Sequence, residues 1–154
     1  MSTLLAATRP TDWNFPLFVH VFGAMVLVGG LLTGASMLAF ARGDTRFLRL
    51  GYWTLLVLAL PGYIVMRIGA EWISSREGWD DLPDEAIPAW LDIGYFVADA
   101  GALLVLIALI LGGIGVRRLR DGKGAGLLKA TMVIALIVLA AALVAVWAMS
   151  GKPD

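Results

Sequence analysis

Four long apolar stretches constrain this chain more than any other feature of its sequence. They run from about Phe15 to Phe40, from Leu50 to Ser74, from Leu91 to Val116 and from Ala130 to Met149. A helix needs roughly 20 apolar residues to cross about 30 Å of hydrocarbon. The sequence therefore predicts an all-α integral membrane protein with four spans. No repeat and no long polar linker divides the chain, which favours a single four-helix bundle over residues 1–154.

The composition agrees with a membrane location and excludes several kinds of site. Apolar residues make up 60% of the 154 residues and charged residues 16%, whereas a soluble domain is about half apolar and about a quarter charged. Too little polar surface remains to cover such a chain in water. The chain has no Cys and one His. Disulfides, thiol redox chemistry, thiolate metal sites and any site that needs two histidines from one chain are therefore excluded.

The basic residues are divided unequally between the two ends of the predicted spans. Eight lie in or beside the connections after the first and third spans: Arg42, Arg46, Arg49, Arg117, Arg118, Arg120, Lys123 and Lys129. The opposite end carries Arg9, Arg76 and Lys152. Cytoplasmic connections carry the excess of Lys and Arg, so we predict that both chain termini lie outside. The acidic segment 75–90 then lies outside as well, and its apolar residues predict that it follows the membrane surface.

One face of the first span carries a stripe of small residues. The stripe consists of residues spaced three and four apart, namely His20, Gly23, Leu27, Gly30, Gly34 and Met37. The GxxxG pair formed by Gly30 and Gly34 permits another backbone to come close. We therefore expect the stripe, with His20, to face protein rather than lipid. A comparable small face is predicted for the fourth span at Ala141, Ala145 and Ala148.

Pro61 lies in the middle of the second span. Proline lacks a backbone N–H and its ring crowds the carbonyl group four residues earlier, here that of Val57. We expect a kink of the helix at this point, which Gly62 makes softer. Membrane helices tolerate it when neighbouring groups satisfy the freed carbonyl.

Three spans each bring one ionisable residue to a similar depth below the predicted outer surface. At about 1.5 Å per residue, His20 lies about 7 Å from the start of its span, Arg67 about 10 Å from the end of its span, and Asp99 about 12 Å from the start of its span. Ionisable groups inside hydrocarbon cost about 2.5 to 3.5 kcal/mol on insertion scales and usually face the protein interior. We therefore predict that the three groups turn toward one another.

Further polar residues share the helix faces of these groups. Tyr63 and Glu71 lie four residues before and after Arg67, and Asp92 and Tyr95 occupy the face of Asp99. The predicted polar cluster accordingly contains His20, Tyr63, Arg67, Glu71 and Asp99. A purely structural interpretation is also open, in which Arg67 pairs with Asp99 or Glu71 and a neutral His20 only fixes the packing of the helices.

Three functional interpretations of the cluster belong to different classes. A proton-coupled transporter would exchange protons between His20 and Asp99, although the inner half of every span is apolar. A haem or copper site would use His20 as ligand, Met66 as a soft partner and Arg67 as the partner of a carboxylate on the bound group. An accessory or assembly protein would contact another membrane protein, or a second copy of itself, through the glycine stripe and the outer loop.

The first span resembles known membrane families. Its run LFVHVFGAMVLVGGLL is similar to the opening helix of small bacterial inner-membrane proteins of unknown function, which are related to the membrane domain of CopD-like copper-resistance proteins. HemJ-type proteins of the haem pathway have a similar His-bearing first helix. The resemblance covers about one span of the four and implies a bacterial cytoplasmic membrane. It also implies that His20, with Met66 or Arg67 in the second span, would hold haem b or copper.

No catalytic motif accompanies these residues. The sequence contains no Ser-His-Asp order, carboxylate dyad, phosphate-binding loop or zinc motif. The basic run RRLRDGK is short and lies beside a span, so lipid headgroups rather than nucleic acid are its expected partner. We therefore predict a non-enzymatic membrane protein that binds a ligand or a partner through the cluster, with a haem- or copper-binding protein as the alternative and a transporter as the further alternative.

Overall fold

A computed structural model describes residues 13–78, 83 and 87–151 of the chain, and this part is helical throughout apart from short turns. Its elements are α1 (Asn14–Phe40), α2 (Thr45–Thr54), η3 (Leu55–Ala59), α3 (Leu60–Glu77), α4 (Ala89–Arg118), η6 (Leu119–Asp121) and α5 (Ala125–Gly151). Because α2, η3 and α3 follow one another without a break, they form one long helix from Thr45 to Glu77. Within the described residues, four helices are long and apolar enough to cross a membrane. They coincide with the four apolar stretches and extend beyond them.

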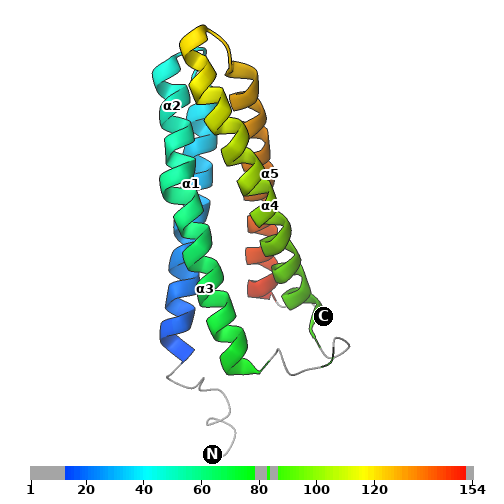
Figure 1. Cartoon of the computed structure of the whole chain (residues 1–154). Coiled ribbons are helices and arrows are strands. Elements are labelled where there is room, and N and C mark those ends of the chain that lie inside the picture. The colour runs from blue at the N-terminus through cyan, green and yellow to red at the C-terminus, as the bar shows by residue number, and fades with distance from the viewer. Residues whose placement is uncertain (1–12, 79–82, 84–86, 152–154) are drawn as a thin grey trace, which may run out of the picture.

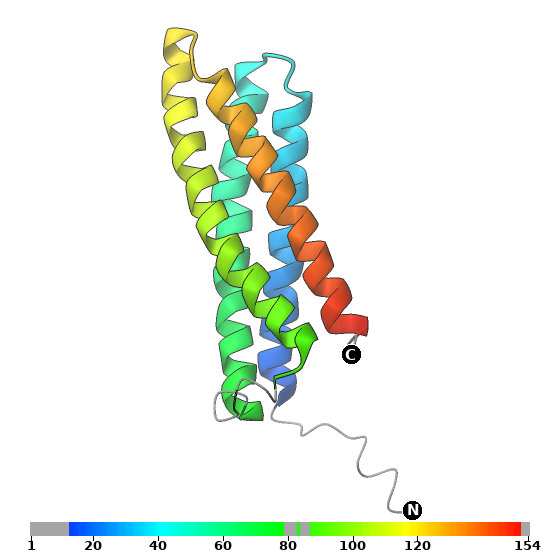
Figure 2. The same ribbon diagram turned by 90° about the vertical axis from the view of Figure 1, so that its right-hand side faces the viewer.

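The four long helices run alternately up and down along one bundle axis (Figures 1 and 2). Helix α1 lies against α2, η3 and α3 along its length, α4 pairs with α5, and α1 also contacts α5. By contrast, α3 and α4 touch only at a few points, and Figure 1 shows them apart toward the end of the bundle where α1 begins and α5 ends. The bundle therefore consists of two closely packed pairs of helices that separate toward one end.

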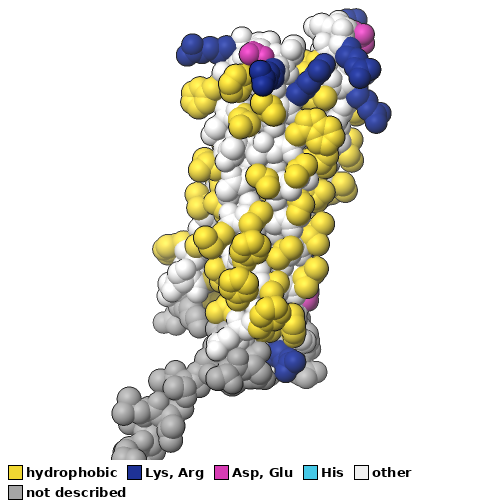
Figure 3. Space-filling model, turned by 90° about the vertical axis from the view of Figure 1, so that its left-hand side faces the viewer, with side chains coloured by type: hydrophobic (Ala, Val, Ile, Leu, Met, Phe, Trp, Pro, Cys, Tyr) yellow, Lys and Arg dark blue, Asp and Glu magenta, His cyan; other side chains and the backbone are white. Residues whose placement is uncertain are grey.

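The surface of the bundle is apolar along its length, and most of its Lys and Arg side chains lie at one end. Figure 3 shows hydrophobic side chains over the flank of the bundle and Lys and Arg side chains gathered around the α1–α2 and α4–α5 connections. Large apolar residues such as Met25, Ile68 and Phe96 are more than half exposed. Such a continuous apolar exterior is what a bilayer accommodates and what water does not.

The helix absorbs Pro61 by a change of hydrogen-bond pattern rather than by a break. Residues Leu55–Ala59 form a π-helical turn, in which the N–H of Leu60 bonds to the carbonyl of Leu55, and Pro61 follows directly after this turn. Proline has no N–H to donate inside this continuous helix, and the π-helical turn replaces the regular α-helical pattern directly before it. The hydrogen-bond pattern thus changes at the position where the sequence predicts a kink, and the kink itself stays a prediction.

Glycines bring the backbones of α1 and α3 together. A Cβ atom added to Gly62 would lie 2.5 Å from the Leu27 nitrogen, and one added to Gly30 would lie 2.7 Å from the Ala59 nitrogen. Gly23 lies in the same way against the backbone of Met66, and Gly69 against that of His20. The prediction that the glycine stripe faces protein is confirmed. Its partner is the second helix of the same chain, so the stripe is not a surface available to another protein.

On the predicted small face of α5, Ala148 is buried and Ala141 and Ala145 are partly buried. Helix α4 also contributes small residues to this helix pair, where Gly112 and Gly115 receive Thr131 and Leu128. Because α4 supplies the space, α5 can present larger side chains. The Thr131 hydroxyl also donates to the carbonyl of Ala108 on α4 at 3.1 Å.

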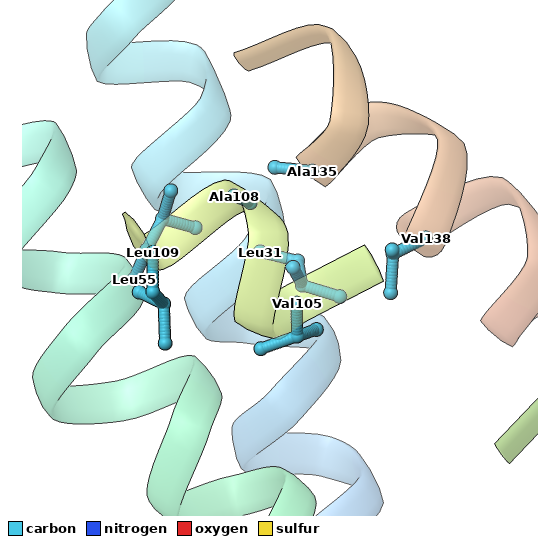
Figure 4. A pocket seen from close by; sticks show the side chains of 7 residues that line it. All are labelled: Leu31, Leu55, Val105, Ala108, Leu109, Ala135 and Val138. Atoms are coloured by element: carbon cyan, nitrogen blue, oxygen red, sulfur yellow. The ribbon is translucent and has the colours of Figure 1, made fainter. Parts of the chain in front are cut away.

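The centre of the bundle is closed where all four helices meet. Leu31 of α1, Leu55 of η3, Val105 of α4 and Val138 of α5 surround a cavity of about 10 Å³ (Figure 4). This is about the space that one water molecule needs, and the side chains that line it are all apolar. The core therefore holds the helices together and leaves no room for a polar ligand at this level.

Candidate functional site

Arg67 lies at the centre of a polar cluster between α3 and α4. Its Nε lies 2.9 Å from Glu71 Oε1 on the same helix, and its Nη2 lies 3.0 Å from Asp99 Oδ1 on α4. The guanidinium carbon is also 5.5 Å from the centre of the Tyr95 ring, within the range of a cation–π contact. One arginine thus engages two carboxylates and an aromatic ring. We call Tyr63, Arg67, Glu71, Tyr95 and Asp99 the Arg67 cluster.

Tyr63 adds a second link between the same two helices. Its hydroxyl donates a hydrogen bond to the carbonyl of Ala98 at 3.0 Å. Tyr63 lies one turn before Arg67 on α3, and Ala98 is next to Asp99 on α4. The two cross-helix polar contacts therefore lie side by side, in a region where α3 and α4 otherwise have few contacts. Polar side chains rather than apolar packing connect the two helices here.

The Arg67 cluster lies on the outside of the bundle. The exposed fractions of the side chains are 28% for Arg67, 52% for Glu71 and 68% for Asp99. The sequence predicted that these groups face the protein interior, yet both carboxylates present most of their surface to the surroundings. With one cation and two anions, the cluster carries one excess negative charge when all three groups are ionised. A ligand or partner can reach it without opening the bundle.

His20 forms a separate contact between α1 and α3. Its Nδ1 lies 3.0 Å from the carbonyl oxygen of Met66. Because a carbonyl oxygen can only accept, Nδ1 carries the hydrogen in this contact, and Nε2 takes no part in it. Among the residues that the structure describes, no hydrogen bond or ion pair joins His20 to Arg67 or Asp99. The structure thus brings together Arg67, Glu71 and Asp99, but not His20.

The residues predicted to hold haem or copper do not form a common ligand set. Met66 contributes its carbonyl to His20, while its side chain packs against the apolar core. Arg67 already engages two carboxylates. The close approach of the backbones at Gly23 and Gly69 leaves no space for a macrocycle between α1 and α3 beside His20. Within residues 13–78, 83 and 87–151, no group of three or more His, Asp or Glu side chains is arranged to hold a metal ion.

Two participants in these contacts were not among the predicted site residues. Tyr95 lies one turn before Asp99, so the shared helix face was a usable signal for its position. The Ala98 carbonyl has no side-chain signal at all. A comparison of the chain with models of protein families, with curated proteins and with solved structures gives no significant match. The arrangement of the residues is therefore the basis for assigning a function.

Proposed function

We propose that this chain is a non-enzymatic, multi-pass membrane protein that binds a ligand or a partner protein through the Arg67 cluster at the outer membrane surface. The observation that carries the proposal is the exposure of two carboxylates on one arginine, on a flank that is otherwise apolar. In the proposed orientation both termini lie outside a bacterial cytoplasmic membrane. This orientation rests on the excess of Lys and Arg at the opposite end of the bundle.

The position of the cluster along the helices agrees with a site at the lipid–water boundary. Eighteen residues separate Arg67 from Arg49, and eighteen separate Asp99 from Arg117. At about 1.5 Å per residue, each interval is about 27 Å, close to the thickness of the hydrocarbon core. If the arginines lie at the inner boundary, the cluster lies near the outer one. Half-exposed ion pairs are far less costly there than at the bilayer centre.

The charge of the cluster indicates what it binds. Arg67 is already paired on both sides, so an anionic group would have to displace a carboxylate and meet the excess negative charge. A cation or a group rich in hydrogen-bond donors would instead add to the free oxygens of Asp99 and Glu71. We therefore assign the cluster to an amine, a guanidinium or a similar donor, carried by a ligand or by a membrane partner.

Photocrosslinking tests this proposal directly. A photoreactive residue in place of Phe96, which is 74% exposed and lies one turn from Asp99, should give a discrete adduct in membranes. The combined change of Glu71→Gln and Asp99→Asn should abolish the adduct, and added spermidine should compete with it. Asp121→Asn, a matched loss of one carboxylate at the other end of the bundle, should leave it unchanged. An adduct that persists in the double variant contradicts the proposal.

Binding of haem or copper by His20 alone stays a prediction, because the hydrogen bond to Met66 does not use Nε2. Holding the other ring nitrogen on a carbonyl is a common way of orienting a ligating histidine. The absorbance spectrum of the purified protein tests it. A Soret band that disappears in His20→Ala supports haem, and a colourless, metal-free protein removes both cofactors. Proton-coupled transport, the further alternative, predicts an ion flux into vesicles that Asp99→Asn changes.

A further inference from the structure

A groove lies between α2 and α4 at the basic end of the bundle, away from the Arg67 cluster. Its volume is about 410 Å³, within the range of small-molecule sites. Tyr52 and Trp53 form one side, and Ile110, Gly113, Ile114 and Arg117 form the other. Helices α2 and α4 lie side by side at this end of the molecule (Figure 1). The groove therefore opens on the flank that faces the bilayer.

Two glycines on α4 leave space for the side chain of Tyr52. A Cβ atom added to Gly112 would lie 2.5 Å from Cδ2 of Tyr52, and one added to Gly113 would lie 3.0 Å from the Tyr52 hydroxyl. The hydroxyl thus lies against the glycine pair at the floor of the groove. Trp53 stands beside it in an edge-to-face contact, with the ring centres 5.8 Å apart, and is half exposed.

The polar groups of the groove have no partner of their own. Neither a hydrogen bond of the Tyr52 hydroxyl nor an ion pair of Arg117 occurs among the described residues, and Arg117 is exposed. Below them along α4 the wall is aliphatic, at Ile114 and Ile110. The groove therefore has the Arg117 cation and the Tyr52 hydroxyl at the predicted headgroup level. Its aliphatic part extends from there toward the hydrocarbon.

The basic residues around the groove favour a negatively charged ligand. Eight basic residues lie at this end, and all are exposed, whereas Asp44 and Asp121 are the acidic residues among them. Each Lys or Arg near a membrane surface contributes about 1 kcal/mol to the attraction of anionic lipid, and basic pockets between membrane helices bind anionic headgroups. A neutral or zwitterionic lipid gains none of this net attraction.

We propose that the groove between α2 and α4 is a binding site for an anionic glycerophospholipid. Its phosphate pairs with Arg117 and accepts a hydrogen bond from Tyr52, while one acyl chain lies along Ile110 and Ile114. The proposal does not depend on the function of the Arg67 cluster, because the two sites are at opposite ends of the bundle.

Quenching of Trp53 fluorescence by brominated lipids tests the proposal on the full-length protein. The protein is reconstituted in phosphatidylcholine vesicles that contain either brominated phosphatidylglycerol or brominated phosphatidylcholine in equal amount. Trp53→Phe identifies the signal of Trp53 by difference. Brominated phosphatidylglycerol should quench Trp53 more strongly, and Arg117→Gln should lower this preference about fivefold, which corresponds to the loss of one cationic contact.

Two further variants separate a site from general attraction of anionic lipid to the basic end. Arg120→Gln removes the same charge outside the groove and should lower the preference much less than Arg117→Gln. Gly113→Leu fills the groove without a change of charge and should abolish the preference. Equal quenching by the two lipids in the unaltered protein overturns the proposal. Equal losses in Arg117→Gln and Arg120→Gln overturn it as well, even if Gly113→Leu fails to fold.

Discussion

Helix α3 meets its two neighbours in opposite ways. Toward α1 it presents Gly62 and Gly69, and the two backbones touch. Toward α4 it presents Tyr63 and Arg67, and side chains span the distance between the helices. We call these the glycine interface and the polar interface. In the proposed membrane location the hydrophobic effect contributes little between helices, so close packing and polar contacts have to hold them together.

The difference between the interfaces lies in how much each can adjust. Backbone atoms in van der Waals contact cannot approach further, and a gap of about 0.5 to 1 Å already removes about a quarter to a half of their attraction. A long arginine side chain, in contrast, can follow a carboxylate through small movements and is partly screened by water where it is exposed. The glycine interface therefore fixes α1 to α3, while the polar interface allows α4 to move relative to α3. A site that binds a partner benefits from lying on the adjustable side.

The largest predicted effect tests the rigidity of the glycine interface. Gly23→Ala places a methyl group in the backbone of Met66, and we expect it to lower the free energy of unfolding by about 1 to 3 kcal/mol, as overpacking does elsewhere. Unfolding in a mixed detergent series, followed by circular dichroism, measures the change.

Gly29 of the same helix supplies the matched control. It has no atom within 4 Å of an added Cβ, so Gly29→Ala should leave the stability unchanged or raise it by up to about 1 kcal/mol, because alanine favours the helix. Equal effects of the two substitutions would mean that α1 and α3 are not in close contact.

Hydropathy and spacing predicted one of these two interfaces better than the other. The apolar stretches and the glycine stripe are periodic along one helix, so they can be read without knowledge of its neighbours. The sequence also contained a matching pattern on the partner helix, since Gly62 and Gly69 have the same separation of seven residues as Gly23 and Gly30.

The polar residues were harder to place because a shared depth does not fix a shared direction. Arg67 and Asp99 meet since α3 and α4 face each other, whereas His20 points to the other side of α3, at the Met66 carbonyl. Which face of a helix meets which neighbour depends on the packing of the whole bundle. For the same reason the sequence analysis did not single out Gly112 and Gly115 of α4, which receive Thr131 and Leu128 of α5.

A substitution at the centre of the polar interface should have a smaller effect on stability. Arg67→Met keeps the length of the side chain but removes both ion pairs and the contact with Tyr95. Because both carboxylates are more than half exposed, we expect a loss of stability of about 1 kcal/mol or less. The distance between α3 and α4, measured between spin labels at Ile64 and Leu103, should nevertheless become longer and more widely distributed.

The comparison becomes sharper with a second pair of labels. Labels at Met25 and Ile64 report the glycine interface, and their distance should not change in Arg67→Met. Arg49→Met, which removes an exposed arginine at the other end of the bundle, should affect neither distance. If both pairs of labels move together in Arg67→Met, the bundle responds as one rigid unit and the distinction between the interfaces fails.

The smallest effect is predicted for Tyr63→Phe, which removes one hydroxyl from the polar interface. The Ala98 carbonyl lies inside α4 and can still accept its own helical hydrogen bond, so the substitution leaves no unsatisfied group. We expect a loss of about 0.5 kcal/mol, at the lower end for a neutral hydrogen bond. In the double variant with Arg67→Met, the loss should be smaller than the sum of the single losses, because each contact holds α4 in place for the other and each single substitution already weakens the second contact. Strict additivity in this double-mutant cycle would show that the two contacts are independent and would contradict this prediction.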